Sequence, residues 1–85
     1  MARRSQDVRG IPLWLLREYL VEAGGRTEGP DRIAGDRWTA RLSELEDYRI
    51  GSLRVGQVRV ELEGAPEVLD AVEARLAPKL LRGGG

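Results

Sequence analysis

The chain of 85 residues contains no cysteine, no histidine and no phenylalanine, and only one of its fourteen basic residues, Lys79, is a lysine. Without cysteine and histidine, a thiol nucleophile, a disulfide, a Cys/His zinc site and an imidazole acid–base group are all excluded. A single lysine also makes lysine-based catalysis a poor explanation. We therefore expect no catalytic residues, no metal site and no cofactor, and we expect that the protein is not an enzyme.

Net charge and long apolar runs are missing as well. Fourteen basic and fourteen acidic residues give a formal net charge of +0, so no overall field draws the protein to nucleic acid, and we expect no nucleic-acid partner. No apolar run approaches the roughly 20 residues of a membrane helix, and no apolar signal-peptide core follows the N-terminus. We expect one cytoplasmic domain over residues 1–85, without membrane contact and with modest stability.

Apolar residues at helical spacing predict two amphipathic helices. The first begins at Pro12, because proline suits the first helical turn, and it ends before Gly24. The second begins at Pro66, and Pro78 predicts that it ends or kinks near Ala77. The apolar stripes consist of Leu13, Leu16, Leu20 and Ala23 in the first helix and of Val68, Leu69, Val72 and Leu76 in the second.

Alternation of apolar and polar residues predicts strands between these helices. Residues 37–43 form one strand, and residues 48–55 form a second with a kink or bulge at Gly51. Residues 58–63 form a third, which follows a two-residue hairpin connection at Gly56 and Gln57. The alternation places one side of each strand toward a core and the other toward water.

The remaining segments complete the expected fold. Residues 26–36 read as a loop that includes a short strand around Ile33, and residues 44–47 read as a turn. Residues 1–9 are either an edge strand or a frayed terminus, and an exposed edge strand would favour a homodimer. The order predicts an α+β fold, β-α-β(4)-α, with an antiparallel sheet of four to five strands and both helices on one face.

Four arginines on the outer face of the predicted sheet are a candidate anion or partner patch. They are Arg37, Arg41, Arg54 and Arg59. Guanidinium groups bind phosphate and carboxylate oxygens well. Glu61 and Glu63 interleave with them, however, so a ladder of cross-strand salt bridges on a solvated face is the alternative.

The chain ends in three glycines, which allow two interpretations. A terminal Gly84-Gly85 could be adenylated, as in a sulfur carrier or ubiquitin-type modifier, because glycine threads a narrow channel and does not hinder attack on the acyl group. Carriers of that kind open with a β-hairpin, whereas a helix is predicted near the start of this chain. The alternative is a flexible glycine tail over residues 82–85, and we expect Leu80 and Leu81 to dock on the core.

The two tryptophans supply most of the aromatic bulk. In a chain without phenylalanine, Trp14 and Trp38 are expected in the core. Alternatively, they line a pocket between the first helix and the sheet, which would favour a small-ligand-binding module.

Several stretches resemble a known family. The segments PLWLLREYLVEAGG and YRIGSLRVGQVRVELEG, followed by a helix and a closing RGGG, resemble the C-terminal domain of MoaD-related proteins over about residues 11–85. Those proteins are related to the small subunit of molybdopterin synthase. The most specific pieces are residues 12–16, residues 51–53 and residues 82–85.

The resemblance implies a fold of the TBP-like or helix-grip type, in which residues 2–8 form a strand. It also implies an association with molybdenum-cofactor biosynthesis or sulfur transfer, through a protein partner from those processes. In MoaD-related proteins the carrier function is expected of a β-grasp domain, and no such domain is expected within these residues. The function that we expect is therefore that of an accessory or binding domain.

Overall fold

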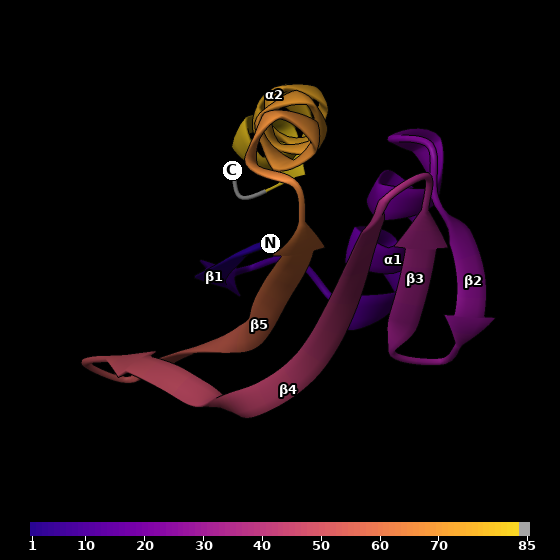
Figure 1. Cartoon of the computed structure of the whole chain (residues 1–85). Helices are drawn as coiled ribbons and strands as arrows, with labels where there is room; N and C mark the ends of the chain where they lie inside the picture. The colour runs from indigo at the N-terminus through magenta and orange to yellow at the C-terminus, as the bar shows by residue number, and fades with distance from the viewer. Residues whose placement is uncertain (84–85) are drawn as a thin grey trace.

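The computed structural model describes residues 1–83, which form one antiparallel sheet and two helices. The elements are β1 (Ala2–Arg9), α1 (Leu13–Glu22), β2 (Arg26–Gly29), β3 (Arg32–Gly35), β4 (Trp38–Ile50), β5 (Leu53–Gly64) and α2 (Pro66–Gly83). The five strands lie side by side in the order β1-β5-β4-β3-β2. The α+β class and the order β-α-β(4)-α are therefore confirmed (Figure 1).

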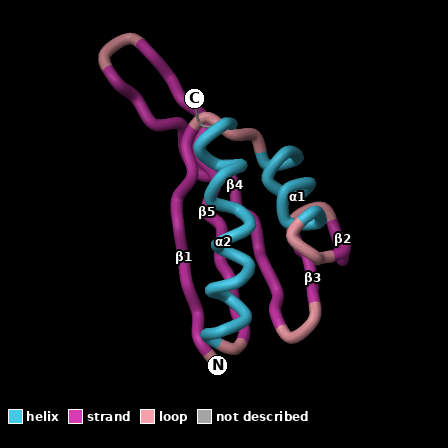
Figure 2. Tube along the Cα trace, turned by 90° about the horizontal axis from the view of Figure 1, so that it is seen from above, coloured by secondary structure: helices cyan, strands magenta, loops and turns pink. Residues whose placement is uncertain are grey.

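Both helices pack on the same side of the sheet, and the sheet curves around them (Figures 1 and 2). Alternate residues of the long strands face the helices, as the period of two requires. The helices contribute Leu16 and Leu69 at the centre, with 1% and 0% of their surface exposed. The core consists of Val8, Ile11, Leu16, Leu20, Ala23, Ile33, Trp38, Ala40, Leu42, Val58, Val60, Leu62, Leu69, Val72 and Leu76.

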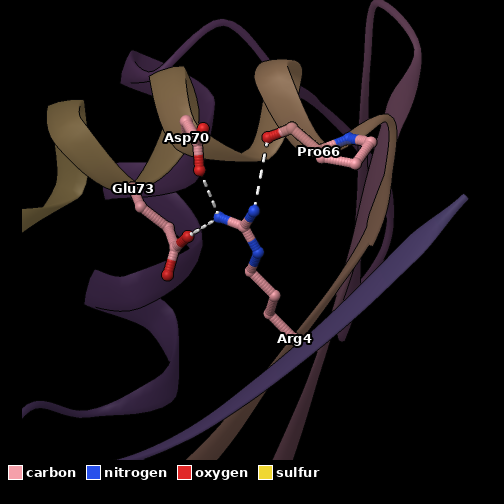
Figure 3. A network of polar contacts seen from close by, with 4 residues as sticks. All are labelled: Arg4, Pro66, Asp70 and Glu73. Atoms are coloured by element: carbon pink, nitrogen blue, oxygen red, sulfur yellow. Dashed lines mark hydrogen bonds and ion pairs between the residues drawn. The ribbon is translucent and has the colours of Figure 1, made fainter.

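Residues 2–9 form a strand at the edge of the sheet. β1 pairs with β5 along its whole length, from Ala2 opposite Gly64 onward. The Arg4 side chain also fastens β1 to α2, because its Nη1 donates to Oδ1 of Asp70 at 2.7 Å and to Oε1 of Glu73 (Figure 3). These charge-assisted hydrogen bonds raise the pKa of Arg4, with the bond to Glu73 as the main cause.

The predicted hairpin connection at Gly56 and Gln57 is wrong. β4 and β5 are connected at Gly51 and Ser52, where Gly51 has a φ of 60°, a conformation that glycine adopts without steric cost. Gly56 and Gln57 lie inside β5, and the C=O of Gly56 accepts a hydrogen bond from the N–H of Gly10 at 2.9 Å. Pairing with the N-terminal strand, which is remote in sequence, keeps this segment extended.

Two other segments are more regular than predicted. Residues 44–47 belong to β4 instead of forming a turn, and an irregularity in register between Leu45 and Tyr48 accommodates one extra residue on β4. Residues 26–36 contain the hairpin β2–β3, in which Ile33 is buried in the core. Neither β2 nor β3 is long enough to show an alternation that a sequence pattern could reveal.

The helix α2 does not end near Ala77 but continues past Pro78. Proline cannot donate to the C=O of Ala74, four residues earlier, but Ala74 and Pro78 are both exposed, so water can satisfy that carbonyl. On the opposite side, Leu76 belongs to the core and Leu80 packs against it. Apolar contacts on both sides of Pro78 therefore keep the segment helical.

The end of the chain is described only in part. α2 includes residues 82 and 83, whereas Gly84 and Gly85 of the predicted tail lie outside the described residues. Leu80 docks on the core as expected, but Leu81 remains 81% exposed. Within residues 1–83, neither helix has the length and apolar character that crossing a membrane requires.

Candidate interaction surface

The structure separates the four arginines that were predicted to form a patch. Arg41 and Arg59 lie on the side of the sheet opposite the helices, which we call the open face. Arg37 lies in the β3–β4 turn with a φ of 64°. Arg54 lies at the beginning of β5, far from that turn, and is opposite Arg49 of β4. Only two of the four therefore share a surface.

On the open face, acidic residues form ion pairs with Arg59 and with Arg3. Arg59 donates from Nε to Oδ1 of Asp7 at 2.9 Å, and Arg3 donates from Nη2 to Oε2 of Glu63 at 2.8 Å. The first hydrogen bond lowers the pKa of Asp7 and raises that of Arg59, and the second raises the pKa of Arg3. These ion pairs are partly exposed, and each contributes little to stability. The open face is therefore a salt-bridge ladder with alternating charges.

The hairpin between β4 and β5 projects beyond the rest of the sheet (Figure 2). We call its outer part, residues 48–55, the distal ribbon. Tyr48 pairs with Val55 and Ile50 pairs with Leu53 across the ribbon, so these four side chains share one face. Ile50 and Leu53 are 57% and 66% exposed, and a contiguous exposed apolar face of this kind is typical of an interaction site.

The base of the distal ribbon is fastened to the N-terminal strand. Arg9 lies over the ring of Tyr48, with its guanidinium carbon 3.5 Å from the ring centroid. Arg9 also donates from Nε to Oε1 of Gln57 at 3.1 Å, and Nε2 of Gln57 donates to the C=O of Glu46 at 3.2 Å. The distal ribbon is thus attached firmly at its base while its tip carries the exposed apolar residues.

A groove separates the beginning of α1 from the base of the distal ribbon. It has a volume of about 550 Å³ and is lined on one side by Pro12 and Trp14 and on the other by Glu44, Asp47 and Val58. The N–H groups of residues 15 and 16 donate to the C=O of Pro12 at 3.1 Å each, which begins the helix there. Trp14 lies in this first turn of α1 and lines the groove.

Trp14 is 54% exposed, so the prediction that it belongs to the core is wrong. Trp38 is only 5% exposed, so the prediction that Trp38 belongs to the core is confirmed. The sequence did contain a signal. Trp14 lies three residues before Arg17 and four before Glu18, two charged residues that mark the solvent side of the helix. Residues at these spacings share one side of a helix, so Trp14 belongs to the solvent side and not to the stripe of Leu16 and Leu20.

The groove combines an aromatic ring with negative charge. Its lining, all within the described part of the chain, contains the carboxylates of Glu44 and Asp47 and neither lysine nor arginine. No group of three His, Cys, Asp or Glu residues within residues 1–83 could hold a metal ion. Chemically, the groove suits a partner surface that presents an apolar group beside a cationic one.

A second hollow lies beneath α2. It has a volume of about 200 Å³ and is lined mainly by apolar side chains, among them Leu16, Leu20 and Leu76. Its polar part consists of Ser5, Gln6 and the pair of Arg4 and Glu73, which bind each other. The hollow is smaller than the roughly 300 Å³ at which typical ligand pockets begin, and the two tryptophans do not line it.

Comparison with known families gives a match over almost the whole chain. Residues 4–85 match the family described as Archaeal MoaD-like protein. The match confirms the resemblance to MoaD-related proteins and extends it from residue 11 into β1. No curated protein matches the chain.

Proposed function

Because the chain belongs to the Archaeal MoaD-like protein family, we propose that it is a non-enzymatic binding domain that acts with a protein partner in sulfur transfer or molybdenum-cofactor biosynthesis. We also infer a fold of the TBP-like or helix-grip type, since the curved sheet holds both helices on one side. Family membership supports the biological context, and the surface supports the role in binding.

The observation that carries the proposal is the exposed Trp14 at the edge of the groove. Burying a tryptophan in a chain without phenylalanine would add to a small core, yet Trp14 keeps 54% of its surface exposed. Tryptophan is the residue type most enriched among interface positions that dominate binding energy. The exposed Trp14 departs from the rule that large apolar side chains are buried, and such departures are expected at functional sites.

The two carboxylates make the partner's chemistry more specific. Glu44 and Asp47 lie on the side of the groove that faces Trp14. An apolar side chain could pack on the indole ring while a lysine or arginine next to it pairs with these carboxylates. The binding surface of the partner is therefore basic and apolar, and binding weakens as salt is added.

The test is a titration of the purified chain against two purified candidates from the same organism, the small subunit of molybdopterin synthase and the enzyme that activates it. We expect at least one of them to bind in calorimetry. Trp14→Ala should then weaken binding by roughly thirtyfold or more, which corresponds to about 2 kcal/mol for an interface hot spot. Val21→Ala is the matched control, because Val21 is also exposed on α1 but does not line the groove.

The carboxylates are tested separately. The double substitution Glu44→Gln and Asp47→Asn preserves size and removes both charges, so it should weaken binding and reduce its salt dependence. If neither candidate binds, the link to sulfur transfer is lost. If one binds but Trp14→Ala has no more effect than Val21→Ala, the partner uses another surface.

A small-ligand function is the second candidate, and the hollow beneath α2 is the observation that favours it. Its volume of about 200 Å³ is below that of typical ligand pockets, but its leucine lining suits a short apolar chain. Octanol is a suitable probe, and Ala77→Phe should fill the hollow from its exposed rim. Saturable binding that this substitution abolishes would support the function, whereas weak, non-saturable uptake by both proteins would contradict it.

A further inference from the structure

β1 is the outermost strand on its side of the sheet, and within the described residues no strand pairs with its outer edge (Figure 2). The N–H of Gly10 donates to the C=O of Gly56, which continues the register of β1 on β5 by one residue. Hydrogen-bonded pairs alternate in an antiparallel ladder, so the even-numbered residues of β1 bond to β5. The backbone groups that point outward are therefore those of Arg3, Ser5, Asp7 and Arg9.

We propose that a second copy of this chain pairs with β1 in the antiparallel direction, with Ser5 of one copy opposite Ser5 of the other. Arg3 of each copy then lies opposite Asp7 of the other, and these residues are the ones whose backbone groups point outward. About six backbone hydrogen bonds would form across the two-fold axis. The two sheets would join into one, with both open faces on the same side.

Charge complementarity selects the second copy as the occupant. Within one chain, Arg3 pairs with Glu63 and Asp7 pairs with Arg59 on the open face. Placing Arg3 opposite Asp7 of the second copy extends the alternation to a row of four, Glu63, Arg3, Asp7 and Arg59. Both Arg3 and Asp7 are exposed, and a carboxylate can accept several hydrogen bonds at once, so the internal pairs need not break.

The neighbouring registers are unfavourable, and this makes the pairing specific. A shift by two residues in one direction places Arg4 opposite Arg4 of the second copy. A shift by two in the other direction places Arg3 opposite Arg9. Like charges directly opposite each other are destabilising, and shifts by one residue would present the backbone groups that already bond to β5. The register centred on Ser5 avoids both problems.

The edge is also held in the geometry that pairing requires. On the helix side of β1, Nη1 of Arg4 binds Asp70 and Glu73, and its Nη2 donates to the C=O of Pro66 at 3.4 Å (Figure 3). These contacts attach β1 to α2, so little conformational freedom is lost when a second strand is added. In the proposed register Arg4 lies opposite Gln6 of the second copy, which carries no charge.

The experiment is sedimentation equilibrium of the chain over a concentration series. Two strands of this length bury less surface than a standard interface, so we expect reversible dimers of twice 9.4 kDa with a dissociation constant in the micromolar range. Arg3→Glu and Asp7→Arg each create two like-charge contacts per dimer, and each alone should weaken dimerisation by about tenfold to a hundredfold.

Mixing the two variants is the decisive step. In the mixed dimer the introduced glutamate faces the introduced arginine, and the unchanged Asp7 faces the unchanged Arg3, so dimerisation should return. Arg41→Glu is the matched control for Arg3→Glu, because it makes the same charge change on the open face away from the edge. Asp36→Arg, in an exposed turn, is the control for Asp7→Arg. Both controls should dimerise like the unsubstituted chain.

A chain that stays monomeric over the whole series would overturn the proposal. So would dimers that both variants leave unchanged, or folded variants that fail to associate when mixed. A measurement without substitutions covers the case in which a variant does not fold: the outward amides of Arg3, Ser5 and Asp7 should exchange hydrogen more slowly as the concentration of the unsubstituted chain rises. Exchange independent of concentration would contradict the pairing. The inference does not depend on the proposed function.

Discussion

Replacing each tryptophan with alanine in turn tests the different roles that the structure gives them. The indole of Trp38 is 5% exposed and lies against the backbones of Gly25 and Gly35, where a Cβ atom would have no room. The indole of Trp14 is 54% exposed at the edge of the groove. The chemical change is the same at both positions, so a difference in unfolding free energy reports the environment alone.

The expected magnitudes follow from burial. Trp38→Ala removes a fully packed ring and leaves a cavity, at a cost of about 3–5 kcal/mol. Trp14 buries less than half of its surface, roughly 100 Å², so its transfer free energy is at most about 2.5 kcal/mol. Residual burial in the unfolded chain and the better helix propensity of alanine reduce this to about 1–2 kcal/mol.

The assay is urea unfolding followed by far-ultraviolet circular dichroism, because tryptophan fluorescence changes with either substitution. A chain of this length has a total stability of about 4–13 kcal/mol. Trp38→Ala should therefore unfold at a much lower urea concentration than the unsubstituted chain, and without urea if the total stability lies at the low end of this range, whereas Trp14→Ala should keep a cooperative transition at a moderately lower midpoint. Equal losses at the two positions would refute the assignment of Trp14 to a binding surface.

Three further predictions concern other parts of the molecule. Gly35→Ala should cost about 1–3 kcal/mol, because the added Cβ overlaps the ring of Trp38. Asp7→Asn should lower the unfolding midpoint at neutral pH, and the difference in midpoint from the unsubstituted chain should shrink below about pH 4. The reason is that Arg59 lowers the pKa of Asp7 in the folded state. The stabilisation is therefore complete above the unfolded pKa and is lost as the pH falls through the folded pKa. Incubation with an activating enzyme and ATP should leave the intact mass unchanged, because we assign no carrier role to Gly85.

Each of these predictions has a control or a contrary outcome. Gly29→Ala is the control for the glycine substitution, since among the described residues no atom beyond its chain neighbours lies within 4 Å of the position of an added Cβ, and it should change stability by less than about 0.5 kcal/mol. Asp36→Asn, in an exposed turn, should give a midpoint difference that does not vary between acid and neutral pH. A mass gain equal to the exchange of one oxygen for sulfur would favour the sulfur-carrier alternative.

Features that depend on short-range patterns could be read from the sequence. The stripe of Leu16 and Leu20 and the alternation of Val58, Val60 and Leu62 predicted the helix, the strand and their buried sides, and all of these residues lie in the core. Such periodicities result from backbone geometry and therefore hold wherever the segment packs. The order of elements and the α+β class followed from them.

The candidate site could be predicted only in part. The composition favoured Trp14 in the core, whereas its spacing from the charged Arg17 and Glu18 favours the solvent side of the helix. The groove beside it also needs Glu44 and Asp47, which the register of β4 on β5 brings to the other side. The projecting distal ribbon could not be foreseen either, because the sequence favoured a turn at the wrong glycine.

By itself, the sequence determined which segments are helices or long strands, which sides they bury, and which chemistries its missing side chains exclude. Only the tertiary structure decided the rest, because those features depend on contacts between residues far apart in the chain. Pairing with β1 keeps Gly56 extended and moves the hairpin to Gly51. Packing of Leu76 and Leu80 keeps α2 helical past Pro78, and the position of β1 at the edge of the sheet leaves the outward backbone groups of Ser5 without a strand partner among residues 1–83.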